Sequence, residues 1–241
     1  MQSSFYVLLS SQVALDKRLT TIASNIANAG SIGYRANKVS FESLLSKPGS
    51  TQSAYSSAGK EFISTASGDM SKTDNPYDVA VIGAGWLGIQ TPDGAAYTRD
   101  GRMKMIETGE LQTVLGFPIL DAGNSPIVLD PTAGPPMIFR DGMINQGERQ
   151  VGALGLFSID EGAELTRGEN SSVIPAKPAT PILDFVRNGV TQGYVEGANV
   201  NPVHEMTKLI MAQRLFESVS AMYDMQDSSQ RNAVRTLGGA T

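Results

Sequence analysis

Helical periodicity is confined to the two ends of this 241-residue chain. Near the N-terminus a predicted helix carries residues at alternating steps of three and four, the spacing of a coiled-coil seam: Phe5, Leu8, Gln12, Leu15, Leu19, Ile22 and Ile26. Near the C-terminus a second predicted helix gathers Met206, Leu209, Ile210, Phe216, Val219 and Tyr223 on one broad face, with Gln213 beside them. An isolated amphipathic helix is marginal in water, so each apolar face needs a partner.

Both predicted helices have recognisable ends. The residues Asn28-Ala29-Gly30 accept the left-handed backbone that closes a helix, so the first helix ends there. Asn201 is placed to cap the start of the second helix, and Pro202 suits its first turn because no N–H is needed there. The second helix is predicted to end near Leu237-Gly238-Gly239.

Glycine, proline and aspartate interrupt the middle of the chain every few residues, which favours short strands joined by turns. We therefore predict an α+β fold in which long N- and C-terminal helices pair as a coiled-coil-like base, with a β-rich, meander- or barrel-like central domain. The alternative is that both helices cover one face of the β-domain. The predicted divisions are an N-terminal helix (1–36), a Ser/Gly-rich linker and extended region (37–75), the β-rich domain (76–190) and a C-terminal helix (191–241).

The stretch VAVIGAGWLG at 79–88 satisfies G-x-G-x-x-G, a pattern of dinucleotide-binding sites. That chemistry requires a helix directly after the glycines, because the helix N-terminus holds the pyrophosphate. Turn signals between Gly88 and Arg102 leave no room for one. We therefore predict a hairpin in which residues 78–82 pair with 86–90, Gly83 and Gly85 adopt positive φ, and Trp86 is buried.

Composition excludes several kinds of function. The formal net charge is −5 and the basic residues are scattered, which disfavours nucleic acid as a partner. Cysteine is absent, and His204 is the single histidine, so neither thiolate catalysis nor a multi-His metal site is available. We predict no catalytic residues, no cofactor, no metal and no small-molecule substrate. An oxidoreductase using the glycine motif and a sugar-binding β-rich module stay open as alternatives.

Three segments carry a family resemblance. IASNIANA at 22–29 with Gly33-Tyr34-Arg35, and GYVEGANVNPVHEMTKLIMAQR at 193–214, resemble the two terminal signatures of bacterial flagellar rod and hook proteins. The central YDVAVIGAGWLGIQTPDGAAYTRDG at 77–101 is similar to the hairpin and Y-T-R-x-G turn of the same family. Ile32 and Ala198 depart from the usual Pro and Ser.

This resemblance implies a structural protein without catalytic activity. It implies a subunit of the proximal rod, polymerising through its terminal helices into the torque-transmitting shaft of the flagellum; a distal-rod or hook-type paralogue is the alternative. Implied partners are copies of the chain, other rod and axial proteins, the export apparatus and the surrounding ring proteins. The implied location is the basal body, spanning the periplasm. Because the N-terminus lacks a basic region and a long apolar core, we expect export without a cleaved signal peptide.

The apolar stripes and the signatures together define a predicted assembly interface. For Asn25 and Asn28, helix capping and hydrogen bonding between subunits are both open. The complete set is Phe5, Leu8, Leu15, Leu19, Ile22, Asn25, Ile26, Asn28, Gly33, Tyr34, Glu196, Asn199, Asn201, Met206, Leu209, Ile210, Gln213, Phe216, Val219 and Tyr223.

Overall fold

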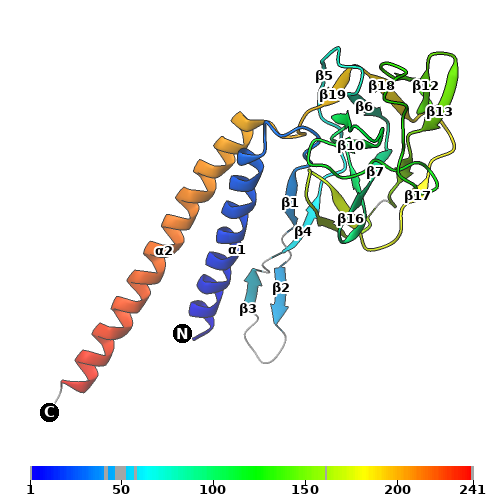
Figure 1. Cartoon of the computed structure of the whole chain (residues 1–241). Coiled ribbons are helices and arrows are strands. Elements are labelled where there is room, and N and C mark those ends of the chain that lie inside the picture. Colours follow the sequence, from blue (N-terminus) through cyan, green and yellow to red (C-terminus); the bar gives the residue numbers. More distant parts are fainter. Residues whose placement is uncertain (1, 41–42, 47–52, 57–58, 161, 240–241) are drawn as a thin grey trace. The chain divides into compact units, whose positions relative to one another are not determined.

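The structure is a computed structural model that describes residues 2–40, 43–46, 53–56, 59–160 and 162–239 (Figure 1). The chain divides into two compact units. Unit 1 consists of Met1–Ala27, Asn37–Phe62 and Asn201–Thr241, and unit 2 consists of Asn28–Ala36 and Ile63–Val200. The chain therefore passes between the units several times, and each unit combines segments that are distant in sequence.

Unit 1 contains both helices and most of four short strands. These elements are α1 (Gln2–Ala27), α2 (Pro202–Gly238), β1 (Asn37–Ser40), β2 (Ser43–Ser46), β3 (Ser53–Ser56) and β4 (Lys60–Ile63). Strands β2 and β3 form an antiparallel hairpin, and β1 pairs with β4. Helix α1 lies between α2 on one side and strands β1 and β3 on the other (Figure 1). All four strands, and β5 below, fall in the region predicted as a Ser/Gly-rich linker and extended region.

The predicted fold class is wrong. The described residues form two helices and a β-rich body, and unit 1 is not a base made of two paired helices. Helix α1 divides its apolar surface between α2 and the strands, while Met206 and Ile210 of the predicted α2 seam stay more than half exposed. In a coiled coil the apolar seam of each helix is buried against the other helix, whereas here part of the predicted apolar face of α2 is exposed. In unit 2 the strands of the largest sheet do not follow chain order, so this body is not a meander.

Helix α2 begins and ends where the sequence predicted. The Asn201 side chain accepts a hydrogen bond from the His204 backbone N at 3.1 Å, and Pro202 occupies the first turn. Glu205 also lies in the first turn, where the positive end of the helix dipole favours an acid. The helix ends at Gly238 as predicted. No helix of the described residues is long and apolar enough to cross a membrane.

The described residues of unit 2 form fifteen further strands. They are β5 (Met70–Lys72), β6 (Val79–Ile82), β7 (Trp86–Thr91), β8 (Gly94–Thr98), β9 (Met103–Met105), β10 (Leu111–Thr113), β11 (Met137–Ile138), β12 (Met143–Gln146), β13 (Arg149–Ala153), β14 (Leu156–Ser158), β15 (Leu165–Arg167), β16 (Val173–Pro175), β17 (Thr180–Pro181), β18 (Gly189–Gln192) and β19 (Tyr194–Glu196). The largest sheet has the order β15-β16-β8-β7-β14-β17. Its β7 supplies Leu87 and Ile89 to the main core, and Trp86 to a second buried cluster with Tyr97 and Phe157.

The glycine stretch forms two strands, but the predicted hairpin between them is wrong. Strand β6 pairs with β18, and β7 pairs with β8 and β14. Gly83 has φ +83° as predicted, whereas Gly85 is not among the residues with positive φ. A Cβ at Gly83 would lie 2.5 Å from Asn188 Oδ1, so the lack of a side chain here lets the segment that precedes β18 pack closely against this turn. Strand β7, which contains Gly88, turns directly into β8 where the motif requires a helix, so the dinucleotide interpretation is not favoured.

Candidate functional site

One charged residue from each of the three family signatures meets the other two inside unit 2. We call residues 28–36, which follow α1, and 193–200, which precede α2, the two connectors. Glu196 lies at the centre: its Oε1 accepts from Arg35 Nη2 at 2.6 Å and from Gly68 N at 2.8 Å, and its Oε2 accepts from Arg99 Nη1 at 3.0 Å. The side chains of all three charged residues are at most 1% exposed. We call Arg35, Arg99 and Glu196 the connector cluster.

Trp86 completes the surroundings of this cluster. The Arg99 and Arg35 guanidinium carbons lie 5.3 and 5.7 Å from the centre of its ring, within the range of a cation–π interaction. Trp86 is buried, as the sequence predicted. Arg99 also donates to the Gly83 carbonyl at 2.6 Å. Because the strands leading to Arg99, Trp86 and Glu196 converge here, the fold brings together charges that no local pattern would pair.

The connector cluster holds two cations and one anion. Burial is the main effect on both guanidiniums: it lowers the pKa of Arg35, and it lowers the pKa of Arg99 to about 10, while the Glu196 carboxylate opposes the shift in each case. Both arginines stay charged at neutral pH. Arg35 Nε and Nη1 and Arg99 Nε have no hydrogen-bond partner among the described residues. The carboxylate is therefore the main compensation for two buried positive charges.

The two connectors also bond to each other directly. Gly33 N donates to the Glu196 carbonyl at 2.7 Å, and Asn199 N donates to the Tyr34 carbonyl at 3.2 Å. The Asn199 side chain accepts from Ala36 N at 2.6 Å and donates to the Ala66 carbonyl at 2.7 Å. Asn199, which we assigned to the assembly interface, thus uses both ends of its amide inside unit 2.

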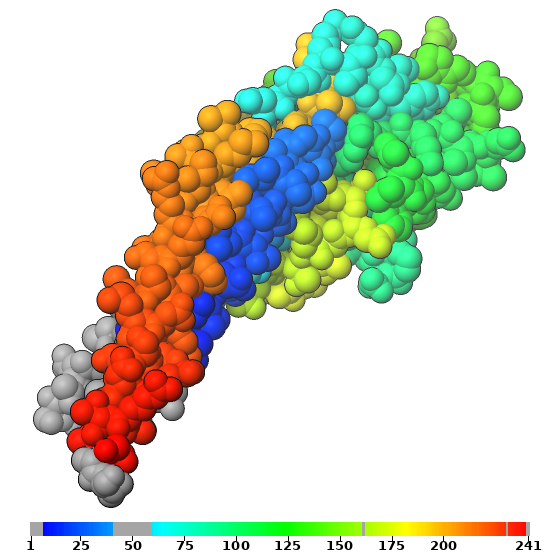
Figure 2. All heavy atoms as spheres, turned by 90° about the vertical axis from the view of Figure 1, so that its left-hand side faces the viewer, coloured from blue at the N-terminus to red at the C-terminus, as the bar shows by residue number. Residues whose placement is uncertain are grey.

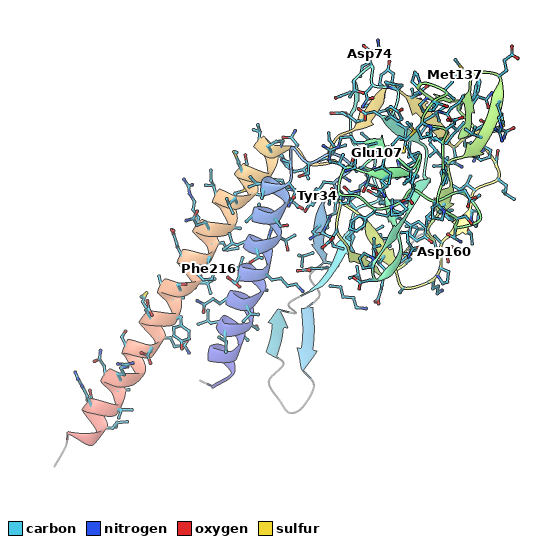
Figure 3. The ribbon with its side chains drawn as sticks, in the orientation of Figure 1. Tyr34, Asp74, Glu107, Met137, Asp160 and Phe216 are labelled. Carbon is cyan, nitrogen blue, oxygen red and sulfur yellow. The ribbon has the colours of Figure 1, made fainter. Side chains whose placement is uncertain are left out.

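Tyr34 and Gly33 of the predicted interface are buried in unit 2. Tyr34 (Figure 3) is 2% exposed, and the Arg167 guanidinium carbon lies 4.3 Å from the centre of its ring. Gly33 has φ +69°, and a Cβ there would lie 2.2 Å from Asp100 N. Only glycine fits this position, both for its backbone conformation and for the close approach of the neighbouring chain.

The two signature asparagines at the end of α1 also form hydrogen bonds within the chain. Asn25 donates to the Asn37 carbonyl and accepts from Asn37 N, both at 2.9 Å, which ties the end of α1 to the start of β1 within unit 1. The Asn28 carbonyl accepts from Ser31 N at 3.0 Å, closing a turn. The Asn28 turn lies at the end of the helix, whereas the Asn25 side chain bonds to β1; for both residues, helix capping and hydrogen bonding to another subunit stay predictions.

The helical part of the predicted interface has a covered side and an open side. Leu15 and Ile22 are buried in unit 1, and Leu8, Leu19 and Ile26 are partly buried. On α2, Leu209, Phe216 (Figure 3), Val219 and Tyr223 are partly buried, whereas Met206, Ile210, Gln213 and the Asn201 cap are exposed. The side chain of Phe5 lies outside the part of the chain that is described.

Sequence reasoning missed a second apolar face on α2. Met211, Leu215, Ser218, Met222 and Met225 follow one another at steps of four and three, the spacing of a helix-packing seam. We call these five residues the outer stripe. Its four apolar members are 66, 50, 55 and 72% exposed in chain order. Figure 2 shows α2 on the surface of unit 1 along its described length. The spacing was visible in the sequence, but the broader stripe on the other face masked it.

Comparison with known proteins identifies the family. Residues 191–236 match the family model described as flagellar basal body rod FlgEFG protein C-terminal, and residues 80–146 match the flagellar hook protein FlgE/F/G D1 domain. The chain is 47% identical to the flagellar basal-body rod protein FlgF of Mesorhizobium japonicum, over 99% of both chains. The chain belongs to the FlgF family of flagellar basal-body rod proteins. It is also 45% identical to FlgF of Rhizobium meliloti, over the full length of both.

The subtype follows from the same comparison. FlgG of Buchnera aphidicola subsp. Schizaphis graminum, a flagellar basal-body rod protein, is 32% identical to this chain and covers 87% of it. The higher identity and fuller coverage of these two FlgF proteins favour the FlgF subtype, as the resemblance implied. The protein is thus a structural subunit of the flagellar rod, located in the basal body and serving motility, and it assembles with other rod and axial proteins.

Proposed function

We propose that this rod protein polymerises through the exposed faces of its terminal helices. The outer stripe of α2 carries this proposal. A helix with apolar residues on opposite faces is stable when both faces are covered, and α1 covers only one of them. Leu9 and Val13 of α1 are also 42 and 52% exposed, so the first helix offers a smaller apolar surface.

The energetics support a stable contact. Fully burying a Leu or Met side chain gains about 1.5–3 kcal/mol relative to leaving it exposed, so four half-exposed side chains give several kcal/mol at each contact. A surface that meets a different surface on the neighbour extends into a filament unless the rotation closes a ring. The stripe therefore suits the axial shaft that transmits torque, in the proximal part that the FlgF names suggest.

We extend the proposal to partners and chemistry. The protein acts without catalysis, cofactor, metal, nucleic acid or small-molecule substrate, which its composition and the absence of catalytic motifs favour. It passes through the flagellar export apparatus, spans the periplasm within the rod, and faces the ring proteins that surround it. These points rest on the resemblance and on the family.

The test compares two equivalent substitutions. Leu215→Asp places a charge in the outer stripe, where Leu215 is 50% exposed; Leu183→Asp makes the same change at an 83% exposed position in unit 2. Both variants should keep the far-UV circular dichroism of the wild-type protein, because neither side chain belongs to a core. In cells lacking the native protein, Leu215→Asp should abolish incorporation into basal bodies and swimming, while Leu183→Asp supports both. Equal incorporation of the two variants would refute assembly through this face.

A further inference from the structure

We infer that the connector cluster positions both terminal helices for assembly by holding the two connectors at a fixed separation. This inference rests on the proposed function, because it assigns the signature residues a task in presenting the helices. Arg35, Arg99 and Glu196 are positioning residues: their side chains are at most 1% exposed, so none of them can touch a neighbouring subunit directly.

The first step concerns what the carboxylate joins. Glu196 belongs to the connector that leads into α2, and Arg35 belongs to the connector that follows α1. Arg99 is the residue directly after β8. A fourth segment contributes the Gly68 backbone N. One side chain therefore ties both connectors to the body of unit 2.

The second step concerns how Arg35 is held. Its guanidinium donates to Glu196, and its other two nitrogens have no hydrogen-bond partner among the described residues. Without the carboxylate, Arg35 and Arg99, which both lie next to the Trp86 ring, would be two buried charges of like sign. Repulsion would then favour moving the α1 connector outward, since burying an uncompensated charge is costly. The attachment of this connector thus depends on Glu196.

The third step concerns distance along the chain. Gly33 and Arg35 lie six and eight residues after Ala27, the end of α1, and Asn199 and Glu196 lie two and five residues before Asn201, the cap of α2. A short connector that is held at one point limits how far the attached helix end can move, whereas a connector without such a contact does not. The cluster therefore holds the two chain segments that continue into the helices at a fixed separation within unit 2, before any neighbour is bound.

A distance measurement in the soluble protein tests this directly. The chain has no cysteine, so Gly30→Cys and Val200→Cys introduce two unique labelling sites, one on each connector. A Cβ at Gly30 meets nothing within 4 Å. Spin labels at these sites should give a narrow distance distribution in the wild-type background. Glu196→Gln should at least double its width and reduce incorporation into basal bodies at least tenfold.

The control is Gln146→Ala in the same unit. Gln146 is buried and bonds the backbone of Asp130 and Gly134, with no bond to either connector. It should lower the melting temperature while leaving the distance distribution narrow. If Glu196→Gln fails to fold, Arg35→Met, which leaves Arg99 and Glu196 paired, should still broaden the distribution.

Three results would overturn the inference. The distribution could stay narrow when Glu196 or Arg35 is replaced, it could broaden equally in Gln146→Ala, or the broadened variants could incorporate normally. Failure of the proposed function can be distinguished from failure of this inference, because Leu215→Asp leaves the connectors intact. If Leu215→Asp assembles normally, the helical face is wrong, while the distance measurement still decides whether the cluster holds the connectors.

Discussion

The charge balance of the connector cluster predicts that replacing either partner of one ion pair lowers the free energy of unfolding by a different amount. Glu196→Gln keeps the shape of the side chain but raises the buried charge from +1 to +2, since Arg35 and Arg99 both lose their anion. Arg35→Met lowers the same charge from +1 to zero and leaves Arg99 paired with Glu196. The free energy of unfolding should therefore fall much more for Glu196→Gln.

The magnitudes follow from the contacts. Removing one partner of a buried ion pair costs about 3–5 kcal/mol, and Glu196 serves two guanidiniums, so the upper end applies. Arg35→Met loses one charge-assisted hydrogen bond, worth about 1.5–3 kcal/mol, and also removes two buried donors that have no partner. At roughly 2–4 °C per kcal/mol for a domain of this size, Glu196→Gln should lower the Tm by about 10–20 °C.

The single tryptophan provides the assay. Trp86 lies against both guanidiniums, so its near-UV circular dichroism follows unfolding of the cluster, and calorimetry checks the Tm independently. If Arg35→Met is as destabilising as Glu196→Gln, charge compensation does not govern this site, and packing on Trp86 would have to explain its stability instead.

Three further outcomes follow from single positions. Gly33→Ala, with its Cβ 2.2 Å from Asp100 N and φ +69°, should unfold or strongly destabilise unit 2 in thermal melts, whereas Gly30→Ala should leave the Tm unchanged; equal Tm values would contradict the close approach. Asn201→Ala should cost α2 about 1 kcal/mol by loss of its cap, seen as earlier helix melting at 222 nm. Leu15→Asp should disrupt unit 1 itself, because Leu15 is buried there, and an unchanged helical signal would argue against that packing.

Local chemistry made much of this fold predictable. The N-cap at Asn201, the end of α1 after Ala27 and the strands on both sides of Gly83 each depend on residues within one turn or strand, and each was correctly placed from the sequence. The pairing of β6 was not, because its partner β18 lies more than a hundred residues away in the chain. The pairing of strands depends on tertiary packing, which the alternation of apolar residues does not encode.

The coiled-coil base failed for a related reason. Helical spacing shows that α1 has an apolar face but not which element covers it, and the region predicted as linker supplied strands that take part of that face. The same limit hid the outer stripe: Met211 and Met222 were visible in the sequence, but a helix with apolar residues all round is understood only once the covered side is known.

The connector cluster illustrates a more general difficulty with polar signature residues. Glutamate and arginine are almost never fully buried unless they are paired, so Glu196 alone favours a surface role. Its partners lie 161 and 97 residues away along the chain, in two other signatures of the same family. Charged residues of opposite sign in separate signatures can therefore form ion pairs with each other. Such pairing explains why they are buried without any contact to a neighbouring subunit. The contacts of Glu196 favour it here, and they are consistent with our proposal that the exposed helical faces carry the assembly.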